Sequence, residues 1–322
     1  MIKIGIVGYG NLGKGIERAC QVFSDMEVVG IFTRRKPDTI KAESPVYSMM
    51  EIENFKNKID ICLLAGGSAT DLVDQGPEVL KHFNTVDCFD THAKVPEYFI
   101  KMNNVGKENN TLSLISTGWD PGLFSIQRLF FECILPQGDT YTFWGKGVSQ
   151  GHSDALRRIE GVKNAVQYTI PNKEVIEKIK AGEKMELTTR DKHFRECFVV
   201  LEEGADGESI RDEIVNMPNY FSDYDTTVHF ISEEELLKDH KGMPHGGTVL
   251  RIGETSDAIK QNIEFNLSLE SNPEFTASVA VAYARAVKRS FDEGKTGAIT
   301  VFDLPLSYLT NRSDEDLRKN YI

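Results

Sequence analysis

The chain has 322 residues, which is too long for one ordinary domain and about right for two. It carries 37 Lys and Arg against 49 Asp and Glu, a formal charge of −12, and 40% of its residues are hydrophobic. This composition is typical of a globular protein, and the negative charge argues against nucleic acids and membranes as partners.

The cysteines indicate the compartment. They are odd in number, far apart and without a C-x-x-C pair: Cys20, Cys62, Cys88, Cys133 and Cys197. We therefore expect neither a disulfide framework nor a structural zinc site, and the scattered histidines also lack the spacing of metal ligands. The chain opens directly into a strand-like run with no signal-like segment before it, so we expect a cytoplasmic protein.

Short apolar, β-branched runs alternate with helical or polar stretches over residues 1–118. The runs are 2–7, 28–32, 59–65, 86–90 and 112–117. Near-continuous apolar strands that alternate with helices are typical of a parallel sheet covered on both faces. The pattern predicts an α/β domain with a Rossmann-type doubly wound parallel sheet.

The pattern changes after residue 118. Apolar residues at helical spacing predict a helix over 123–135, and strands are predicted at 198–201, 228–231 and 263–269. The last of these alternates apolar and polar residues, as a strand with one solvated face does. We therefore expect a second, α+β domain with an open, mainly antiparallel sheet over 119–274. A helix over 273–292 and a strand over 298–304 return to the first domain, so that 275–322 complete it.

A glycine-rich loop follows the first strand. Gly8, Gly10 and Gly13 form G-x-G-x-x-G, and a helical pattern and a second strand come next. Such glycines allow a tight turn and let backbone N–H groups approach a pyrophosphate at a helix N-terminus. The alternative is an ordinary glycine-rich turn, but the context favours a dinucleotide site.

The end of the second strand selects the cofactor. An NAD site usually has Asp or Glu here, whereas this chain has Thr33, Arg34 and Arg35. Each guanidinium can hold a 2′-phosphate with paired hydrogen bonds, which predicts NADP; a solvated basic turn is the alternative. The small residues Gly66, Gly67 and Ser68 follow the third strand, where they leave space for the cofactor.

Two carboxylates lie just past strand-like runs, and strand ends line the crevice in this fold. Asp90 is followed by Thr91 and His92, and Asp120 stands in the segment GWDPG. Two carboxylates near a nicotinamide suit a cationic substrate such as an amine. The alternatives are a turn role for Asp90 and a helix N-cap role for Asp120, with a helix opening at Pro121.

Three features of the second domain have an ordinary structural interpretation. The segment 143–154, rich in glycine and polar groups, is typical of a binding loop or of an ordinary surface loop. Asn272 before Pro273 is typical of a helix N-cap. From its residue pattern alone, Arg195 is a charge on the solvated face of a strand.

The chain resembles a known family over nearly its whole length. The segments GYGNLG, FTRR, GGSATD, FDTH, STGWDPG, FWGKGVSQGHSDALRRI, VQYTIP, FRECFVV, GMPHGG and NPEFTAS occur in this order. Together they resemble the NADP-dependent meso-diaminopimelate D-dehydrogenases. The departures are small: a Gly66-Gly67 doublet where one glycine after a bulkier residue is expected, and Thr33 in place of a serine.

The resemblance implies a role for each matching position. At the substrate, Asp90 and Asp120 lie near the reacting D-centre as the catalytic pair, and the other residues are Trp119, Trp144, Gln150, Gly151, Thr169, Arg195, His245 and Asn272. Of these, Thr169, Arg195, His245 and Asn272 hold the distal L-centre. At the cofactor we expect Gly8, Gly10, Asn11, Leu12, Gly13, Thr33, Arg34, Arg35, Gly66, Gly67, Ser68, Thr91, His92, Trp119, Asp120, Pro121 and Gly122.

The resemblance also implies the reaction and the assembly. The expected activity is the reversible, NADP-dependent oxidative deamination of meso-2,6-diaminopimelate to L-2-amino-6-oxopimelate and ammonia, in a homodimer. Two alternatives remain at this point: another reductase on the same scaffold, such as a dihydrodipicolinate-reductase-like enzyme, and a non-catalytic NADP sensor.

Overall fold

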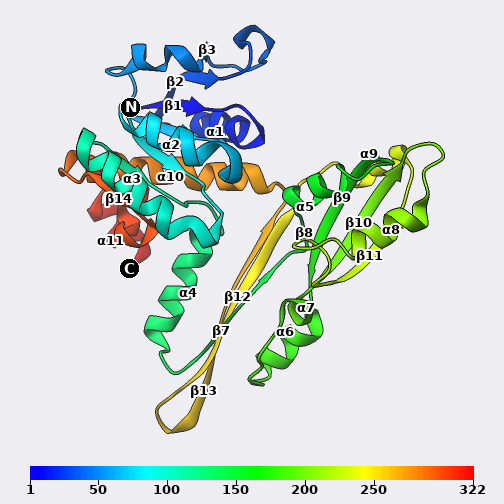
Figure 1. The fold of residues 1–322 in the computed structure, drawn as a ribbon. Helices are drawn as coiled ribbons and strands as arrows, with labels where there is room; N and C mark the ends of the chain where they lie inside the picture. Colours follow the sequence, from blue (N-terminus) through cyan, green and yellow to red (C-terminus); the bar gives the residue numbers. More distant parts are fainter. The chain divides into compact units, whose positions relative to one another are not determined.

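The computed structural model describes residues 1–322, apart from the side chains of Ala69 and Asp257, and the chain divides into two compact units (Figure 1). The first unit joins Met1–Ile126 to Pro273–Ile322, and the second is Gln127–Asn272. The division falls at 126/127 and 272/273, compared with 118/119 and 274/275 in the sequence prediction. The roles assigned to the two parts stay predictions.

A seven-stranded sheet forms the first unit. Its strand order is β14-β6-β5-β4-β1-β2-β3, and every adjacent pair is parallel. The chain moves outward from β1 through β2 and then returns to β4 on the other side of β1. This reversal is the switch point of a doubly wound fold, where ligands bind beyond the carboxyl ends of the strands. The strands are β1 Ile2–Val7, β2 Met26–Thr33, β3 Val46–Ser48, β4 Ile61–Leu64, β5 Asn84–Asp87, β6 Leu112–Leu114 and β14 Gly297–Ile299.

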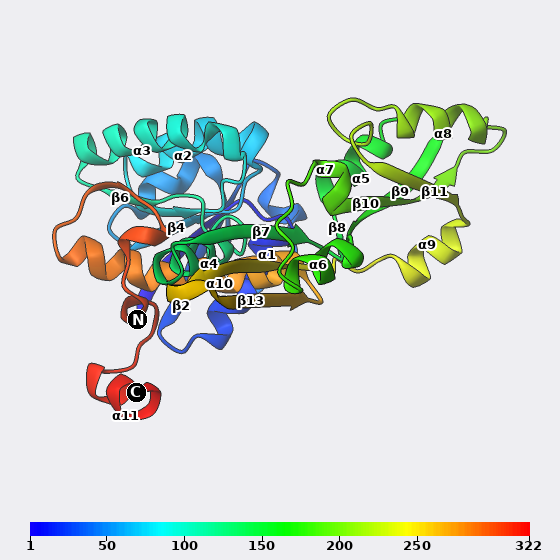
Figure 2. The same cartoon turned by 90° about the horizontal axis from the view of Figure 1, so that it is seen from below.

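Helices cover both faces of this sheet, as the near-continuous apolar strands require. One core packs α1 and α10 against one face, and a second core packs α2 and α3 against the other (Figure 2). The Rossmann-type prediction is therefore confirmed. The helices are α1 Asn11–Val22, α2 Val73–Leu80, α3 Val95–Asn109, α10 Asn272–Asp292 and α11 Asp314–Tyr321, while α4 Leu123–Ile134 crosses the boundary between the units.

Three strands end earlier than the sequence predicts. β5 ends at Asp87 instead of 90, and β6 ends at Leu114 instead of 117. Ser116 has a φ of 55°, a left-handed conformation that no strand continues. β14 ends at Ile299 instead of 304, because Thr300 and Asp303 form a capping box that starts a short 3-10 helix. At each of these points the chain leaves the sheet at its carboxyl edge.

Two sheets form the second unit, where the sequence predicts one. The order is β11-β10-β9-β8 in the first and β13-β12-β7 in the second, and all pairs are antiparallel except β10 with β11. The strands are β7 Gly138–Trp144, β8 Gly147–Val148, β9 Val162–Pro171, β10 His193–Leu201, β11 Asp225–Phe230, β12 His245–Thr255 and β13 Ile259–Leu269. The helices are α5 Gln150–Leu156, α6 Lys173–Lys180, α7 Thr189–Lys192, α8 Gly207–Val215 and α9 Glu233–Asp239.

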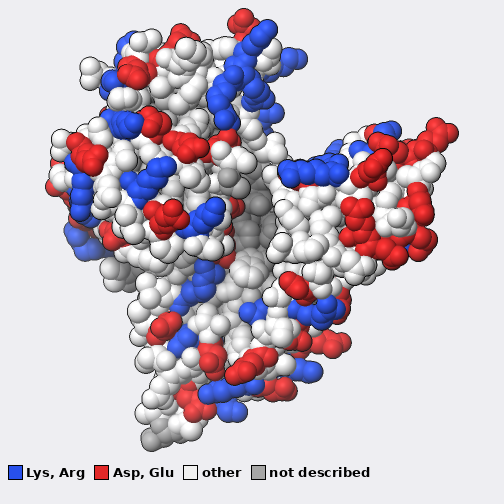
Figure 3. Space-filling view, viewed as in Figure 1, with Lys and Arg blue, Asp and Glu red and all other residues white. Residues whose placement is uncertain are grey.

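The surface is charged and mixed in sign. In Figure 3, Asp and Glu side chains gather over the end of the second unit that carries α8 and α9. The first turn of α9 contains three glutamates, Glu233 to Glu235, which favour a helix N-terminus. Within the part of the chain that the structure describes, no helix has the length and apolarity needed to cross a membrane.

A buried ion pair attaches the C-terminal part of the chain to the start of the first unit. Arg285 of α10 donates to both carboxylate oxygens of Asp25 at 2.6 Å, and also donates to the carbonyl of Leu309. The Arg285 side chain is 5% exposed. Hydrogen bonds from this guanidinium hold the pKa of Asp25 below its ordinary value.

We predict that Arg285→Met lowers the free energy of unfolding by about 3 kcal/mol at neutral pH, because it leaves the Asp25 carboxylate without its partner. Since the pKa of Asp25 is depressed in the fold, the stabilisation is present above the ordinary Asp pKa and is lost as pH falls through the native value. Urea unfolding at pH 7 and at pH 3 measures both effects.

Lys288→Met on the same helix is the matched control, because Lys288 forms a solvent-accessible ion pair with Asp292. This substitution should lower the free energy of unfolding by less than about 0.5 kcal/mol. Equal destabilisation by the two variants would contradict the role given to Arg285.

Candidate active site

The glycine-rich loop joins β1 to α1 at the switch point. Gly8 has a φ of 93°, a conformation that favours glycine. A Cβ on Gly13 would lie 2.3 Å from the carbonyl oxygen of Gly8, so only glycine allows the helix to start this close to the strand. Around Gly10 there is open space within 4 Å of a Cβ position. The loop therefore leaves room for a phosphate group at the N-terminus of α1.

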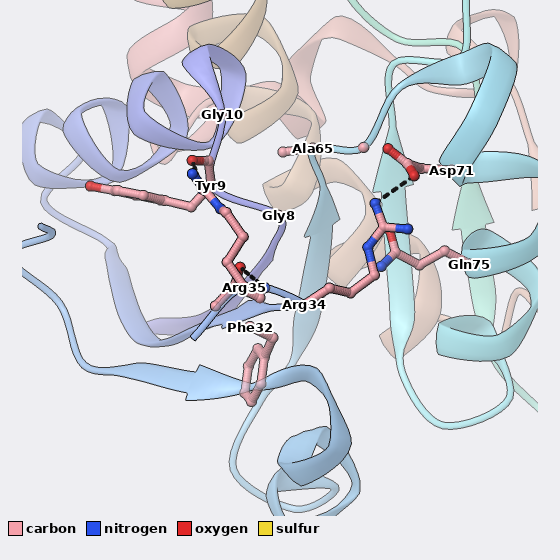
Figure 4. Close-up of a pocket in the computed structure, with 11 residues that line it drawn as sticks. Gly8, Tyr9, Gly10, Phe32, Arg34, Arg35, Ala65, Asp71 and Gln75 are labelled. Atoms are coloured by element: carbon pink, nitrogen blue, oxygen red, sulfur yellow. Dashed lines mark hydrogen bonds and ion pairs between the residues drawn. The ribbon is translucent and has the colours of Figure 1, made fainter. Parts of the chain in front are cut away.

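A cavity of about 300 Å³ opens beside this loop (Figure 4). It lies at the carboxyl ends of β1, β2 and β4, as expected for a doubly wound sheet. Six of the predicted cofactor residues line it: Gly8, Gly10, Thr33, Arg34, Arg35 and Gly66. Five further lining residues were missed by the sequence analysis: Tyr9, Phe32, Ala65, Asp71 and Gln75. The other predicted cofactor residues do not line this cavity: Asn11, Leu12, Gly13, Gly67, Ser68, Thr91, His92, Trp119, Asp120, Pro121 and Gly122.

The two arginines after β2 approach the cavity from different directions. Arg34 forms an ion pair with Asp71 at 2.5 Å, and Arg35 donates to the carbonyl oxygen of Tyr9 at 2.5 Å (Figure 4). Thr33 accepts a hydrogen bond from the backbone N–H of Arg35 at 3.1 Å, which fixes the turn between the strand and the arginines.

Asp71 also accepts a hydrogen bond from the N–H of Gly67 at 3.0 Å. Although burial opposes it, this bond and Arg34 lower the pKa of Asp71. The Asp71 carboxylate thus holds the Arg34 guanidinium at the cavity. Two cations at the end of β2, without an acidic residue directly after it, fit a dinucleotide that bears a 2′-phosphate.

Asp90 lies in the loop after β5, with its backbone N–H donating to Ser68 Oγ at 3.0 Å. Its loop depends on a second aspartate, which the sequence analysis missed. Asp87 is fully buried and accepts hydrogen bonds from the N–H groups of Phe89 and Ser116 at 3.0 Å and from the Tyr98 hydroxyl at 2.9 Å.

Burial raises the pKa of Asp87 to about 6, although these three hydrogen bonds oppose the shift. One carboxylate therefore holds together the loop of Asp90 and the loop that leads to Asp120. No local pattern signals this role, because the partners lie up to 29 residues away.

The segment with Asp120 is a tight turn. Trp119 and Gly122 form an isolated antiparallel bridge around it, and the Asp120–Pro121 peptide bond is cis. α4 begins at Leu123, not at Pro121, so the alternative that Asp120 is the N-cap is wrong. The residue directly before the helix is Gly122, whose N–H donates to Ser125 Oγ at 3.1 Å.

Arg195 and Thr169 face each other on adjacent strands. They are direct partners in the β9–β10 register, and Arg195 Nη1 donates to Thr169 Oγ1. Arg195 is 6% exposed and its guanidinium lies 3.8 Å from the ring centroid of Tyr224. The alternative of a solvated strand face is therefore wrong: the odd-numbered side chains of β10 face the covered side of the sheet.

The guanidinium of Arg195 is incompletely paired. Among the described residues, its buried Nε has no hydrogen-bond acceptor. Burial lowers the pKa of Arg195, because desolvation disfavours a cation. A buried cation with an unused donor is a site for an anion, and the fork of a guanidinium fits a carboxylate.

His245 packs next to this pair. A Cβ on Gly147 would lie 2.4 Å from the His245 ring, so glycine at 147 is what lets the imidazole approach β8. Gly147 is in turn the register partner of Thr169. Burial lowers the pKa of His245, and Arg195 adds to the shift. The fold thus brings three residues predicted for the distal end, Thr169, Arg195 and His245, to one place.

The segment 143–154 is more regular than the predicted loop. β7 ends at Trp144, β8 is Gly147–Val148, and Gln150 and Gly151 begin α5. Gln150 is exposed, with its side-chain nitrogen 3.2 Å from Met243 Sδ. The carbonyl of Met243 accepts a hydrogen bond from the N–H of Asn272 at 2.9 Å, at the first residue of α10.

Comparisons with known proteins show the family of the chain. Residues 118–271 match the family model of the diaminopimelic acid dehydrogenase C-terminal domain. The chain is 58% identical to a meso-diaminopimelate D-dehydrogenase from Ureibacillus thermosphaericus, with 100% of this chain and 99% of the relative covered.

Two solved structures are similar over the whole chain. One is a substituted meso-diaminopimelate dehydrogenase from Clostridium tetani with diaminopimelate, at a TM-score of 0.94 and 53% identity, with 100% of both chains covered. The other is an engineered D-amino acid dehydrogenase bound to NADP⁺, at a TM-score of 0.89 and 40% identity, covering 100% of this chain and 99% of that one. The chain belongs to the meso-diaminopimelate D-dehydrogenase family.

Proposed function

We propose that this chain catalyses the reversible oxidative deamination of meso-2,6-diaminopimelate at its D-centre, with NADP⁺ as the oxidant. The observation that supports it most is the buried Arg195 guanidinium with an unused donor beside Thr169 and His245. A substrate with an amino acid at each end needs one clamp for the end that does not react. Arg195 supplies that clamp through a charge-assisted bond to the distal carboxylate.

The chemistry is a hydride transfer followed by hydrolysis. When bound, NADP⁺ supplies the hydride acceptor, C4 of the nicotinamide. The D-centre loses a hydride and a proton and becomes an imine; water adds to it, ammonia leaves, and L-2-amino-6-oxopimelate remains. Asp90 and Asp120 bind the ammonium group at the reacting centre, and Trp119 and Trp144 pack against the substrate there.

Stereochemistry follows from holding both ends. With Thr169, Arg195, His245 and Asn272 on the L-centre, a single hydrogen of the other centre can face the cofactor. Gln150 and Gly151 contact the substrate between these groups. Gly10, Asn11 and Leu12 hold the pyrophosphate, and Thr33, Arg34 and Arg35 hold the 2′-phosphate. Ser68, Thr91, His92 and Pro121 line the nicotinamide side in this proposal.

The same proposal covers the assembly and the compartment. We propose a homodimer in the cytoplasm, as the family resemblance and the five unpaired cysteines favour.

An NADP⁺ reduction assay with the meso-, LL- and DD-isomers of diaminopimelate tests the activity. We expect turnover of the meso-isomer and none of the LL-isomer, which has no D-centre. Reduction of a cyclic imine without activity on diaminopimelate would favour a dihydrodipicolinate-reductase-like enzyme. Cofactor binding without turnover of any amino acid would favour a sensor.

The first prediction from the site concerns the cofactor. Replacing Arg34 and Arg35 together by glutamine should weaken NADP⁺ binding roughly ten- to a hundredfold for each lost charge-assisted contact, and NAD⁺ binding far less. Titration of both nucleotides measures this. Lys36→Gln is the control, because Lys36 is the next cation along the chain and does not line the cavity. Unchanged NADP⁺ affinity in the double variant would contradict the 2′-phosphate assignment.

The second prediction concerns the distal clamp. Arg195→Met should raise the KM for meso-diaminopimelate by at least thirtyfold, since removing one partner of a desolvated ion pair costs about 2–5 kcal/mol. NADP⁺ affinity should stay the same, and the melting temperature should not fall, because methionine removes a buried cation.

Arg190→Met is the matched control for Arg195, because Arg190 lies five residues earlier in the chain and forms an exposed ion pair with Asp225. Equal KM values for Arg195→Met and the unmodified protein would show that Arg195 does not bind the substrate.

The third prediction concerns Asp120. Asp120→Asn keeps the shape and loses the charge, so we expect kcat/KM to fall between thirtyfold and several thousandfold while the fold stays intact. Asp206→Asn is the matched control, because Asp206 caps α8 through its side chain and Asn caps about as well. Near-normal turnover of the Asp120 variant would exclude a role at the substrate.

A further inference from the structure

Trp144 depends on a residue outside its own sheet. It is the last residue of β7, an edge strand of the sheet β13-β12-β7, and its register partner on the neighbouring strand β12 is Gly247. Its backbone N–H donates to Nε2 of His193 at 2.9 Å. His193 is the first residue of β10, which belongs to the other sheet of the second unit. A single imidazole therefore connects the end of β7 to β10.

The two side chains also contact each other. The His193 and Trp144 rings stack, with centroids 5.4 Å apart and an angle of 27° between the planes. His193 is 3% exposed, whereas Trp144 is only half-buried. Because Nε2 accepts a hydrogen bond, the ring is neutral and carries its proton on Nδ1. Burial, with Arg195 and Lys192 nearby, lowers the pKa of His193 to about 3, which keeps the acceptor available at neutral pH.

His193 shares a strand face with the distal clamp. It lies two residues before Arg195, so both side chains point to the same, covered face of β10, roughly 6.8 Å apart along the strand. The residue that contacts the Trp144 ring therefore lies on the same strand face as the Arg195 guanidinium.

We propose that His193 is a positioning residue for the substrate. It holds Trp144 in two ways, by accepting a hydrogen bond from the Trp144 backbone N–H and by stacking on the Trp144 ring, and it lies on the strand face that carries Arg195. This inference rests on the proposed role of Trp144 at the substrate. His193 touches neither the reacting atoms nor the cofactor in this scheme. Its effect is on where the Trp144 ring lies, and so on how tightly the substrate is held.

Two variants separate the contacts. His193→Phe keeps a ring for the stack and removes the acceptor, which leaves the Trp144 N–H without its partner. His193→Gln keeps an acceptor near the place of Nε2 and removes the ring. For the phenylalanine variant we expect a five- to hundredfold rise in the KM for meso-diaminopimelate, with kcat within about threefold. The glutamine variant should recover part of this loss.

Fluorescence reports on Trp144 without any turnover. The chain has two tryptophans, so Trp119→Phe leaves Trp144 as the only emitter. In that background we expect both His193 variants to shift the emission maximum and to increase quenching by acrylamide, since the stack or the hydrogen bond is lost. His229→Phe is the matched control, because it replaces an imidazole of the same unit that stacks on a different ring, Phe198, at 4.9 Å. The control should change neither the emission nor the KM.

The outcomes distinguish this proposal from the proposed function. Altered Trp144 emission with a KM within twofold of the unmodified protein would overturn the positioning role and leave His193 a packing residue. Loss of the folded state in both His193 variants, seen by circular dichroism, would overturn it in the same way. If the unmodified protein does not oxidise meso-diaminopimelate at all, the proposed function fails, whereas the emission change still tests the contact between His193 and Trp144.

Discussion

The buried guanidinium of Arg195 is the constraint on which the predicted distal site depends. Removing a cation from water is expensive unless other groups compensate for the lost hydration. Here the Tyr224 ring and the Thr169 hydroxyl compensate in part, and the Nε donor has no acceptor among the described residues. An anion with a hydrogen-bond acceptor would satisfy this donor. The absence of a side chain at Gly147 lets the His245 ring approach, and this ring lies near the same cation.

The first unit solves a different problem, which is to hold several loops at one edge of a sheet. Its strands are short, and the loops beyond two of them carry the predicted catalytic carboxylates. Asp87 connects two of these loops through the N–H groups of Phe89 and Ser116 and also accepts from the Tyr98 hydroxyl of α3, and Asp71 connects the Gly67 turn to Arg34. Both aspartates use a buried or half-buried charge to fix backbone groups. Side-chain to backbone hydrogen bonds from these two aspartates thus fix loops at this edge of the sheet, in addition to the glycine-rich turn.

Local pattern was enough to predict the fold class, because glycine spacing and apolar runs are local properties. The sheet of the first unit, its glycine-rich turn and the return of α10 and β14 followed from them. Long-range contacts were not visible in the same way. Asp87, Asp71 and His193 each have a partner far away in the sequence, namely Ser116, Arg34 and Trp144, and no local pattern indicates these contacts.

The interpretation that Arg195 lies on a solvated strand face was wrong for a related reason. The alternation of residues along a strand separates its two faces, but it does not say which face other parts of the protein cover. The assignment of Asp120 as a cap failed because the turn before α4 is two residues longer than an Asp-Pro start implies. In both cases the residue type was informative and its surroundings decided the role.

A crystal structure of the protein with NADP⁺ and meso-diaminopimelate would show what the Arg195 guanidinium binds. We predict that the carboxylate of the L-centre accepts hydrogen bonds from this guanidinium, with Nε as one of the donors, while Thr169 and His245 contact the same end of the molecule. A complex in which that carboxylate binds elsewhere and the Arg195 Nε stays unpaired would contradict it.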